Sequence, residues 1–452
     1  MAKAKKRSRK PSRAPALFTR LRKHFGTDPA KLPVIEQTFP SYDRANLHLT
    51  LQELLAASDP PAALVGVLVE RYSGLSLAKL ARKETAKSFQ EGPVQYADVQ
   101  LADEQKLACV KQGLYTFREA GRPLALLVAE EDTYRSEKGL EVAVMAADRE
   151  TAERFGRKLA AGVRHGSAFR GKVLSVEGNR SDGPTVRFHK LPDVRRENLI
   201  LPEDLLRRIE RQAMGLSKYA DKLKAAGRHL KRGILMHGKP GTGKTLSAMY
   251  LAAQMPGRTV MVLTGGAVGS IETACALARL LEPATIILED VDLIGTEREH
   301  QSVCANALLF ELLNQMDGLG EDADILFLLT TNRPDFLEPA LAARPGRIDL
   351  AIEVPLPDEE CRRRLFALYG RGLRLELADP EVWVRRTKGV SAAFVRELLR
   401  KAAVLAAEAN GTGDELVVTD RHVDEALAEL LVAGGPMTRS LLGFAGGAPS
   451  GN

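Results

Sequence analysis

The chain has 452 residues, 44% of them hydrophobic and 27% charged, with four cysteines and a net charge of +7. This length is too great for one hydrophobic core and predicts about two to four domains of a globular protein. No apolar stretch is long enough for a membrane span or a signal peptide, so the sequence predicts a cytoplasmic protein. The cysteines form no C-x-x-C pair, which argues against zinc or disulfides; Cys275 and Cys304 are expected to be small buried residues.

The charge is unevenly distributed along the chain. Residues 1–24 carry ten lysines and arginines and no acidic residue, so subtracting them from the net charge of +7 leaves −3 for the remainder. Such a tail is compatible with attraction to nucleic acid, anionic lipid or an acidic partner, and equally with a solvated disordered terminus. Nucleic acid is not favoured, because Phe18 is the one aromatic residue nearby. A mitochondrial presequence is the weaker alternative, since the cations are clustered.

Residues 26–200 are expected to form a proline-rich connector followed by a mixed α/β module. Helices are predicted by apolar spacing at 42–68 and at about 101–119, and by a helix start at Asp148. Strands are predicted at 123–129, 140–145, 172–176 and 185–188. The module contains no catalytic constellation, and His165 and His189 are expected at the surface.

From Arg232 onward, near-continuous apolar strands alternate with helices. The strands are expected at 232–237, 259–263, 284–288 and 325–329, with helices at about 246–252, 271–282 and 302–316. This pattern predicts a parallel sheet covered on both faces, with ligands bound beyond the carboxyl ends of its strands. Four amphipathic helices should follow as a small bundle, at 358–370, 379–387, 391–409 and 419–432.

A phosphate-binding loop joins the first of these strands to its helix. Its spacing is Gly238-x-x-x-x-Gly243-Lys244-Thr245. Glycines allow successive N–H groups to turn toward a polyphosphate, and the helix start adds its positive dipole end. Lys244 is expected to reach the β- and γ-phosphates of ATP, and the Thr245 hydroxyl to ligate Mg²⁺. The residues expected to contact the nucleotide are Gly238, Lys239, Pro240, Gly241, Thr242, Gly243, Lys244, Thr245 and Leu246.

Acidic and amide side chains follow the next strands. Glu289, Asp290 and Asp292 come directly after the strand at 284–288, about 45 residues beyond the loop. A triphosphate-cleaving site needs one carboxylate to hold Mg²⁺, here Glu289, and another to polarise the attacking water, here Asp290. Asn332 ends the following strand and is expected to project between the loop and the acids, although Asn before Arg-Pro is also ordinary turn chemistry.

Arg344-Pro-Gly-Arg347 places two guanidinium groups on a tight turn. Such charges stabilise the negative charge that develops on a transferring phosphoryl group. We expect them on the side of the domain away from the loop, where they would reach the nucleotide of a neighbouring subunit. The alternative is a surface salt bridge with Asp349 or Glu353.

Together these segments resemble the AAA ATPase family. The resemblance covers about 201–435 and rests on the loop at 238–245, on Asn314-Gln-Met-Asp-Gly-Leu319, and on the second region of homology. That region comprises Thr331-Asn-Arg-Pro-Asp335, Ala340-Leu-Ala-Ala-Arg-Pro-Gly-Arg-Ile-Asp349 and Val354-Pro-Leu-Pro-Asp358. The likeness implies Walker A and Walker B motifs, Asn332 as sensor 1, Arg344 and Arg347 as arginine fingers acting in trans, and a ring, usually a hexamer.

The chain departs from the family pattern at two places. The family normally has Asp then Glu after the third strand, whereas here Glu289 precedes Asp290. This exchange moves each carboxylate by about one methylene and predicts slower hydrolysis with both charges retained. Where family members that thread polypeptides carry an aromatic pore residue, this chain has Ala267-Val268-Gly269, which predicts a weak grip on an extended chain.

The sequence therefore predicts an α/β protein: an AAA+ phosphate-loop core, a C-terminal helical lid and a separate N-terminal α/β domain. The expected parts are a disordered basic tail (1–28), a partner-binding domain (29–200), the large ATPase subdomain (201–357), the lid (358–435) and a flexible C-terminus (436–452). The expected function is Mg²⁺-dependent ATP hydrolysis in a homo-oligomeric ring that remodels or translocates a protein partner. The alternatives are an ATPase that binds nucleic acid through its tail, and a weakly hydrolysing nucleotide-gated scaffold.

Overall fold

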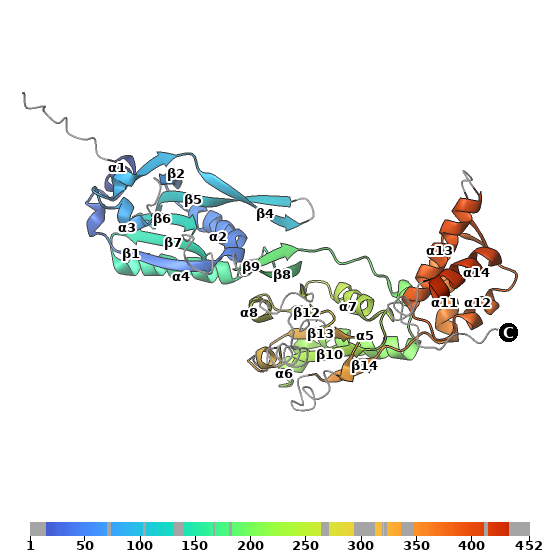
Figure 1. Cartoon of the computed structure of the whole chain (residues 1–452). Helices are drawn as coiled ribbons and strands as arrows, with labels where there is room; N and C mark the ends of the chain where they lie inside the picture. Colours follow the sequence, from blue (N-terminus) through green and yellow to red (C-terminus); the bar gives the residue numbers. More distant parts are fainter. Residues whose placement is uncertain are drawn as a thin grey trace, which may run out of the picture. The chain divides into compact units, whose positions relative to one another are not determined.

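The computed structural model describes residues 15–69, 74–102, 105–130, 139–165, 168–179, 183–263, 271–292, 312–318, 320, 323–335, 348–410 and 415–433. The chain divides into two compact units (Figure 1). The first contains residues 1–170 and 177–188, and the second contains residues 171–176 and 189–452. Among the helices in the described ranges, none is long and apolar enough to cross a membrane.

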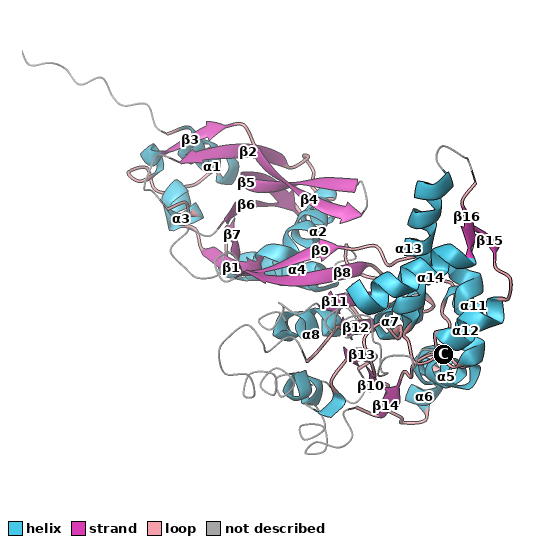
Figure 2. Ribbon diagram, turned by 45° about the vertical axis from the view of Figure 1, so that its right-hand side comes forward, coloured by secondary structure: helices cyan, strands magenta, loops and turns pink. Residues whose placement is uncertain are grey.

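The first unit is built on an antiparallel sheet with strand order β1-β7-β6-β5-β2-β3, and β4 pairs with β5 (Figure 2). The strands are β1 (Val34–Pro40), β2 (Ala63–Val69), β3 (Phe89–Gly92), β4 (Gln95–Ala102), β5 (Gln105–Glu119), β6 (Arg122–Glu130) and β7 (Gly139–Ala146), and β9 (Gly183–Phe188) also belongs to this unit. The helices are α1 (Ala16–Phe25), α2 (Arg44–Ala56), α3 (Leu77–Leu80) and α4 (Arg149–His165), with short turns η1 (Pro29–Lys31), η2 (Ser41–Asp43) and η3 (Ala86–Ser88).

Helices cover both faces of this sheet. Along β6, Leu124 and Leu126 pack with α2 and α4, whereas Ala125 and Leu127 pack with α1 and α3. The strand is therefore apolar at successive positions even though its side chains alternate between the two faces. Such a strand is expected in a sheet buried on both sides.

Two helix predictions in this unit are wrong. Residues 105–119 form strand β5, which pairs with β2, β4 and β6. Leu114, Tyr115 and Phe117 are all buried, so burial on both faces hides the alternation that identifies a strand. The second half of the predicted 42–68 helical region is β2, whose valines favour a pleated strand. The first half does form a helix, α2.

The second unit has a parallel sheet with the order β14-β10-β13-β12-β11-β8. Its strands are β8 (Val173–Asn179), of which residues 173–176 belong to this unit, β10 (Arg232–His237), β11 (Thr259–Leu263), β12 (Ala284–Leu288), β13 (Ile325–Thr331) and β14 (Leu350–Glu353). Its helices are α5 (Glu203–Lys218), α6 (Ala220–Ala225), α7 (Lys244–Ala253) and α8 (Ile271–Leu280), preceded by the turn η4 (Arg196–Asn198). The prediction of an α/β fold with a parallel sheet is confirmed.

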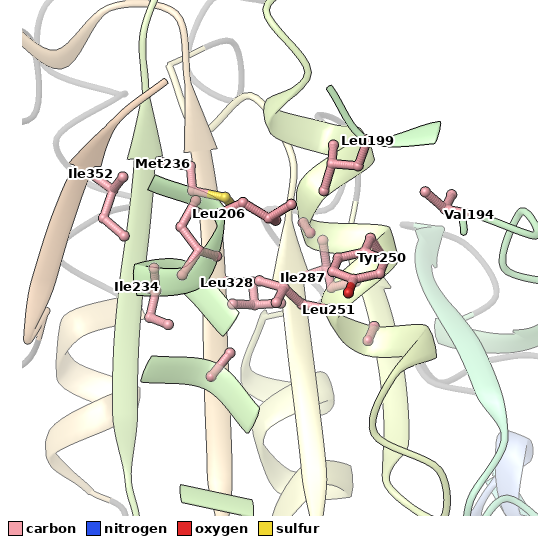
Figure 3. Close-up of a cluster of buried hydrophobic side chains, with 14 of the residues drawn as sticks. Val194, Leu199, Leu206, Ile234, Met236, Tyr250, Leu251, Ile287, Leu328 and Ile352 are labelled. Atoms are coloured by element: carbon pink, nitrogen blue, oxygen red, sulfur yellow. The ribbon is translucent and has the colours of Figure 1, made fainter. Parts of the chain in front are cut away.

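One hydrophobic core joins α5 and α7 to one face of this sheet. Leu206 of α5, Leu251 of α7, and Ile234, Ile287 and Leu328 of the strands meet there, all nearly inaccessible to solvent (Figure 3). Because α7 begins directly after the phosphate loop, this packing fixes the direction of the helix and holds the loop at the carboxyl end of β10. β10 lies between β13 and the edge strand β14, and open parallel sheets bind ligands beyond the carboxyl ends of such strands.

The helices that follow β14 form a second core, here called the C-terminal bundle. It contains α11 (Glu359–Tyr369), α12 (Pro380–Arg386), α13 (Ala392–Asn410), α14 (Asp420–Ala428) and the π-helical turn η6 (Glu429–Ala433), with a short parallel pair, β15 (Arg374–Glu376) and β16 (Val417–Thr419). Buried Trp383 fills its centre and donates a 2.6 Å hydrogen bond to Asp420. Ile200, far away in sequence, packs into the same core.

Candidate functional site

The loop after β10 adopts a conformation that requires glycine. Gly238, Gly241 and Gly243 have φ angles of +143°, +72° and +104°, which L side chains rarely adopt. A Cβ atom on Gly238 would lie 2.4 Å from the carbonyl oxygen of Val354, and one on Gly241 would lie 2.7 Å from Cβ of Ala393. The loop is thus closely packed on its outer side and leaves its backbone free to turn inward.

Lys244 occupies the first position of α7 and points back into the loop. Its ammonium group donates hydrogen bonds to the carbonyl oxygens of Gly238 (3.0 Å) and Lys239 (2.8 Å) and to Oδ1 of Asn332 (2.7 Å). The residue is buried, and this burial lowers the pKa of the ammonium, whereas the nearby Asp290 and Asp292 raise it. The loop therefore encloses a positive charge that two carboxylates help to maintain.

Asn332 connects the lysine to the acidic residues. While its Oδ1 accepts from Lys244, its Nδ2 donates to Oδ1 of Asp290 over 3.0 Å. It follows β13, and Asp290 comes two residues after β12, so the register of two adjacent parallel strands brings their ends together. The sequence-based expectation that Asn332 lies between the loop and the acids agrees with this geometry.

Asp292 holds Thr331 and Asn332 in position at the end of β13. One carboxylate oxygen, Oδ1, accepts hydrogen bonds from the hydroxyl of Thr331 (2.7 Å) and the backbone N–H of Asn332 (3.2 Å). Asp290 is held by its own N–H, which donates to Thr330 Oγ1, and it adopts a positive φ of 47°. The segment after β12 is thereby fastened to the end of β13 by two threonine side chains.

The carboxyl groups of Glu289 and Asp290 both have raised pKa values. Burial is the main cause of the raised pKa of each carboxyl; the charge of Asp290 adds to it for Glu289, and that of Asp292 adds to it for Asp290. Lys244 and the Asn332 hydrogen bond oppose the shift at Asp290. Oε1 of Glu289 is buried and has no hydrogen-bond partner within the described residues. A cation beside these groups would remove the cost of burying their charge.

A pocket of about 580 Å³ opens above the loop, within the range of small-molecule sites. Residues 240–246, Asp290 and Asn332 line it, so these predicted site residues share one cavity. Other lining residues come from outside the motifs, namely Pro192, Asn198, Leu199, Ile200, Met249, Leu365, Tyr369, Ala392, Ala393 and Arg396. The N–H of Ala393 donates a 3.0 Å hydrogen bond to the carbonyl of Gly241, which ties the C-terminal bundle to the loop.

The sequence model of the ATPase family associated with various cellular activities (AAA) matches residues 234–356. Residues 234–356 are an AAA ATPase domain. The matched segment begins in β10 and ends just beyond β14, so it contains the phosphate loop, the acids and Asn332.

Relatives of this AAA domain include a metalloprotease and a proteasome subunit. The chain is 33% identical over 233 residues to the ATP-dependent zinc metalloprotease FtsH 2 of Symbiobacterium thermophilum, covering 48% of this chain and 39% of that protein. It is 34% identical over 192 residues to the probable 26S proteasome regulatory subunit 6B of Caenorhabditis elegans, covering 40% of this chain and 46% of that protein. The chain thus spans less than half the length of these relatives.

Some predicted elements of the AAA domain lie outside the described residues. These are Arg344 and Arg347, the segment Ala267-Val268-Gly269, Cys304 and most of the expected helix at 302–316. Cys275 is buried, as expected for a small apolar residue, and His165 and His189 are exposed. The pocket residues from the C-terminal bundle had no signal in the sequence beyond ordinary helical periodicity.

Proposed function

We propose that the chain is an Mg²⁺-dependent ATPase that hydrolyses ATP to ADP and phosphate. The observation that supports this most strongly is the hydrogen-bonded series Lys244–Asn332–Asp290, which lines one pocket together with the phosphate loop. A phosphate-binding cation, a neutral amide and a carboxylate base are the groups that phosphoryl transfer to water needs within reach of one another.

The loop would bind the phosphates of ATP. Its N–H groups and the start of α7 offer positive partial charge, and Lys244 would exchange its carbonyl acceptors for phosphate oxygens. Lys244 loses no net hydrogen bonding in this exchange. Its contact with Asn332 would keep the lysine directed at the end of the triphosphate.

Asp290 would accept a proton from the attacking water, with Asn332 holding its carboxylate in place over 3.0 Å. Thr245, exposed at the start of α7, and Glu289, whose buried Oε1 has no partner within the described residues, would hold Mg²⁺. This donor set fits the ion, because Mg²⁺ prefers oxygen ligands and few protein carboxylates. The ion supplies charge neutralisation for the phosphates.

The site would be completed by a second subunit. We propose that Arg344 and Arg347 act on the nucleotide of a neighbour in a homo-oligomeric ring, by likeness to the AAA family a hexamer. Arginines supplied in trans stabilise the charge of the transition state and make hydrolysis depend on assembly. ATPase activity per subunit would then rise with protein concentration.

The work of the cycle would be done on a protein partner. The relatives are an ATP-dependent protease and a proteasome regulatory subunit, and this favours remodelling or translocation of a protein. We propose residues 29–200 as the partner-binding domain, 201–357 as the large ATPase subdomain and 358–435 as its helical lid, with two changes to these predicted bounds. Within the tail predicted as disordered (1–28), Ala16–Phe25 form α1, which packs into the core of the first unit. Residues 189–200 belong to the second unit.

Phosphate release by the purified full chain, with ATP and Mg²⁺, tests this proposal. Steady multiple turnover is expected, Lys244→Ala should abolish ATP binding, and Asp290→Asn should bind ATP without turnover. Full hydrolysis by Asp290→Asn would show that another group is the base. Less than one turnover per subunit by the native chain would favour the weakly hydrolysing scaffold.

A further inference from the structure

We propose that Arg196 is a positioning residue for the nucleoside part of the nucleotide. It lies in residues 192–200, here called the strap, which run from the end of β9 toward α5 and form one wall of the pocket. The inference rests on the proposed nucleotide binding and assigns a role to a residue outside the AAA motifs.

The strap bridges the two cores of the second unit. Leu199 packs against α5 and α7 in the core of the sheet, where Figure 3 shows it above Tyr250. The next residue, Ile200, packs into the C-terminal bundle. Both also line the pocket, as does Asn198. The position of this wall therefore depends on the contacts that hold the strap in place.

Arg196 makes a polar contact that holds the strap against α5, which packs on the sheet. Its guanidinium donates through Nε to Oε1 of Glu210 (2.9 Å) and through Nη2 to Oε1 of Glu203 (2.7 Å), with longer contacts to the second oxygen of each. Both acids are on α5: Glu203 is its first residue, and Glu210 lies about two turns further on. A planar guanidinium that engages two carboxylates fixes both distance and direction, which a lysine cannot do.

The contact extends to the helix of the phosphate loop. Tyr250 of α7, buried in the core, donates its hydroxyl to the same Oε1 of Glu210 over 2.6 Å. The Glu210 side chain is 14% exposed and that of Arg196 45%, so solvent screens the Tyr250–Glu210 contact more weakly than the Arg196 end of the junction. The carboxylate of Glu210 thus joins the strap, α5 and α7. It holds the strap wall of the pocket in position relative to the helix that begins at Lys244.

Arg196 supports the strap wall directly and is connected to the helix of the phosphate loop through Glu210 and Tyr250. The phosphates depend on the loop and Lys244, which Arg196 does not touch. The base and ribose would lie against the strap, because Pro192, Leu199 and Ile200 give it an apolar lining, whereas the bundle lines the pocket with the cation Arg396. Loss of Arg196 should therefore weaken ground-state binding of ATP and leave the chemical step intact, which appears as a raised KM with an unchanged kcat.

The experiment compares Arg196→Gln with Arg195→Gln in the full chain. Arg195 is an adjacent strap residue, and its described ion pairs are to Asp193 (3.6 Å) and Glu197 (4.0 Å), both within the strap, so the control makes the same charge change without the link to α5. For Arg196→Gln we expect KM for ATP to rise roughly tenfold with kcat within about twofold. Arg195→Gln should match the native chain, and Arg196→Lys should recover part of the affinity.

Inorganic triphosphate separates this role from general damage. As a competitive inhibitor it requires the loop but not the strap, so its inhibition constant should be the same in Arg196→Gln and the native chain. An equal loss of triphosphate and ATP affinity, or a fall in kcat at unchanged KM, would overturn the inference. If Arg196→Gln fails to fold, Tyr250→Phe, which removes one hydroxyl, should show a smaller rise in KM. Absence of ATP binding in the native chain would instead overturn the proposed function.

Discussion

Lys244 and Asn332 are 88 positions apart in the chain, yet Nζ of the lysine lies 2.7 Å from Oδ1 of the amide. The contact exists because β10 and β13 are adjacent parallel strands that end at the same edge of the sheet. The same amide donates to Asp290. One neutral side chain therefore sets the distance between the phosphate-binding cation and the proposed base.

Asn332→Ala should lower kcat by about a hundredfold while ATP affinity changes little. The variant loses the amide that contacts Lys244 and Asp290, and such polar groups stabilise the transition state most, when charge develops on the phosphoryl group. Single-turnover phosphate release and equilibrium binding of ATP measure the two quantities separately. A variant with native kcat would show that the amide is only a structural contact.

The acid limb of the kcat–pH profile should lie above the usual aspartate value of 3.8, since burial and the charge of Asp292 raise the pKa of Asp290. A base acts only when deprotonated, so activity falls as pH falls through this raised pKa. The Asn332 hydrogen bond opposes the rise. Residual activity of Asn332→Ala should therefore show its acid limb at higher pH than the native chain, and a limb that moves to lower pH would contradict the assignment of Asp290.

Asp292→Ala should destabilise the second unit by about 2–3 kcal/mol, because the buried hydroxyl of Thr331 and the N–H of Asn332 lose their shared acceptor. Asp292→Asn retains an oxygen acceptor and should cost less. Denaturant unfolding of both variants gives the difference. Equal stability of the two would mean that the carboxylate is not the anchor of this segment.

Gly238→Ala should abolish ATP binding, since its Cβ would lie 2.4 Å from the main-chain oxygen of Val354 and the φ angle of +143° adds strain. Gly257→Ala is the matched control: its φ is +84°, and no atom lies within 4 Å of the added Cβ. The control should lose about 1–3 kcal/mol of stability from backbone strain alone and keep its affinity for ATP. Calorimetric titration distinguishes the two variants.

Asp43→Asn should remove a pH dependence from the stability of the first unit. Burial raises the pKa of Asp43 from 3.8 to about 6, and Asn46 opposes the shift. The stability linked to this group is fully present below 3.8 and is lost as pH rises through about 6. At pH 8 the variant should gain up to about 3 kcal/mol relative to its effect at pH 3. Hydrogen exchange of α2 amides measures this, and an unchanged pH dependence would exclude Asp43 as its source.

The phosphate loop, the acids and Asn332 could be found from the sequence because each directly follows an apolar strand. Parallel strands bring their carboxyl ends to one edge, so the order along the chain predicts proximity in space. Tyr369 and Arg396 line the same pocket but belong to amphipathic helices, where nothing distinguishes a pocket residue from a surface residue.

The ion pairs between different elements could not be predicted from the sequence either. Glu203 and Glu210 have the spacing of an ordinary solvated helix face, and their convergence on Arg196 depends on how the strap crosses α5. The prediction of a helix at β5 failed for a related reason. Helices cover both faces of its sheet, and periodicity identifies a strand only when one face is polar.

The hydrogen bond from the Ala393 N–H to the Gly241 carbonyl joins two main-chain atoms. A side-chain replacement at position 393 leaves both atoms present, except for proline, which lacks the donor. Substitutions within α13 can thus change the chemistry of the pocket wall. The hydrogen bond between the bundle and the loop is retained, because it depends on the backbone fold and not on the side chains.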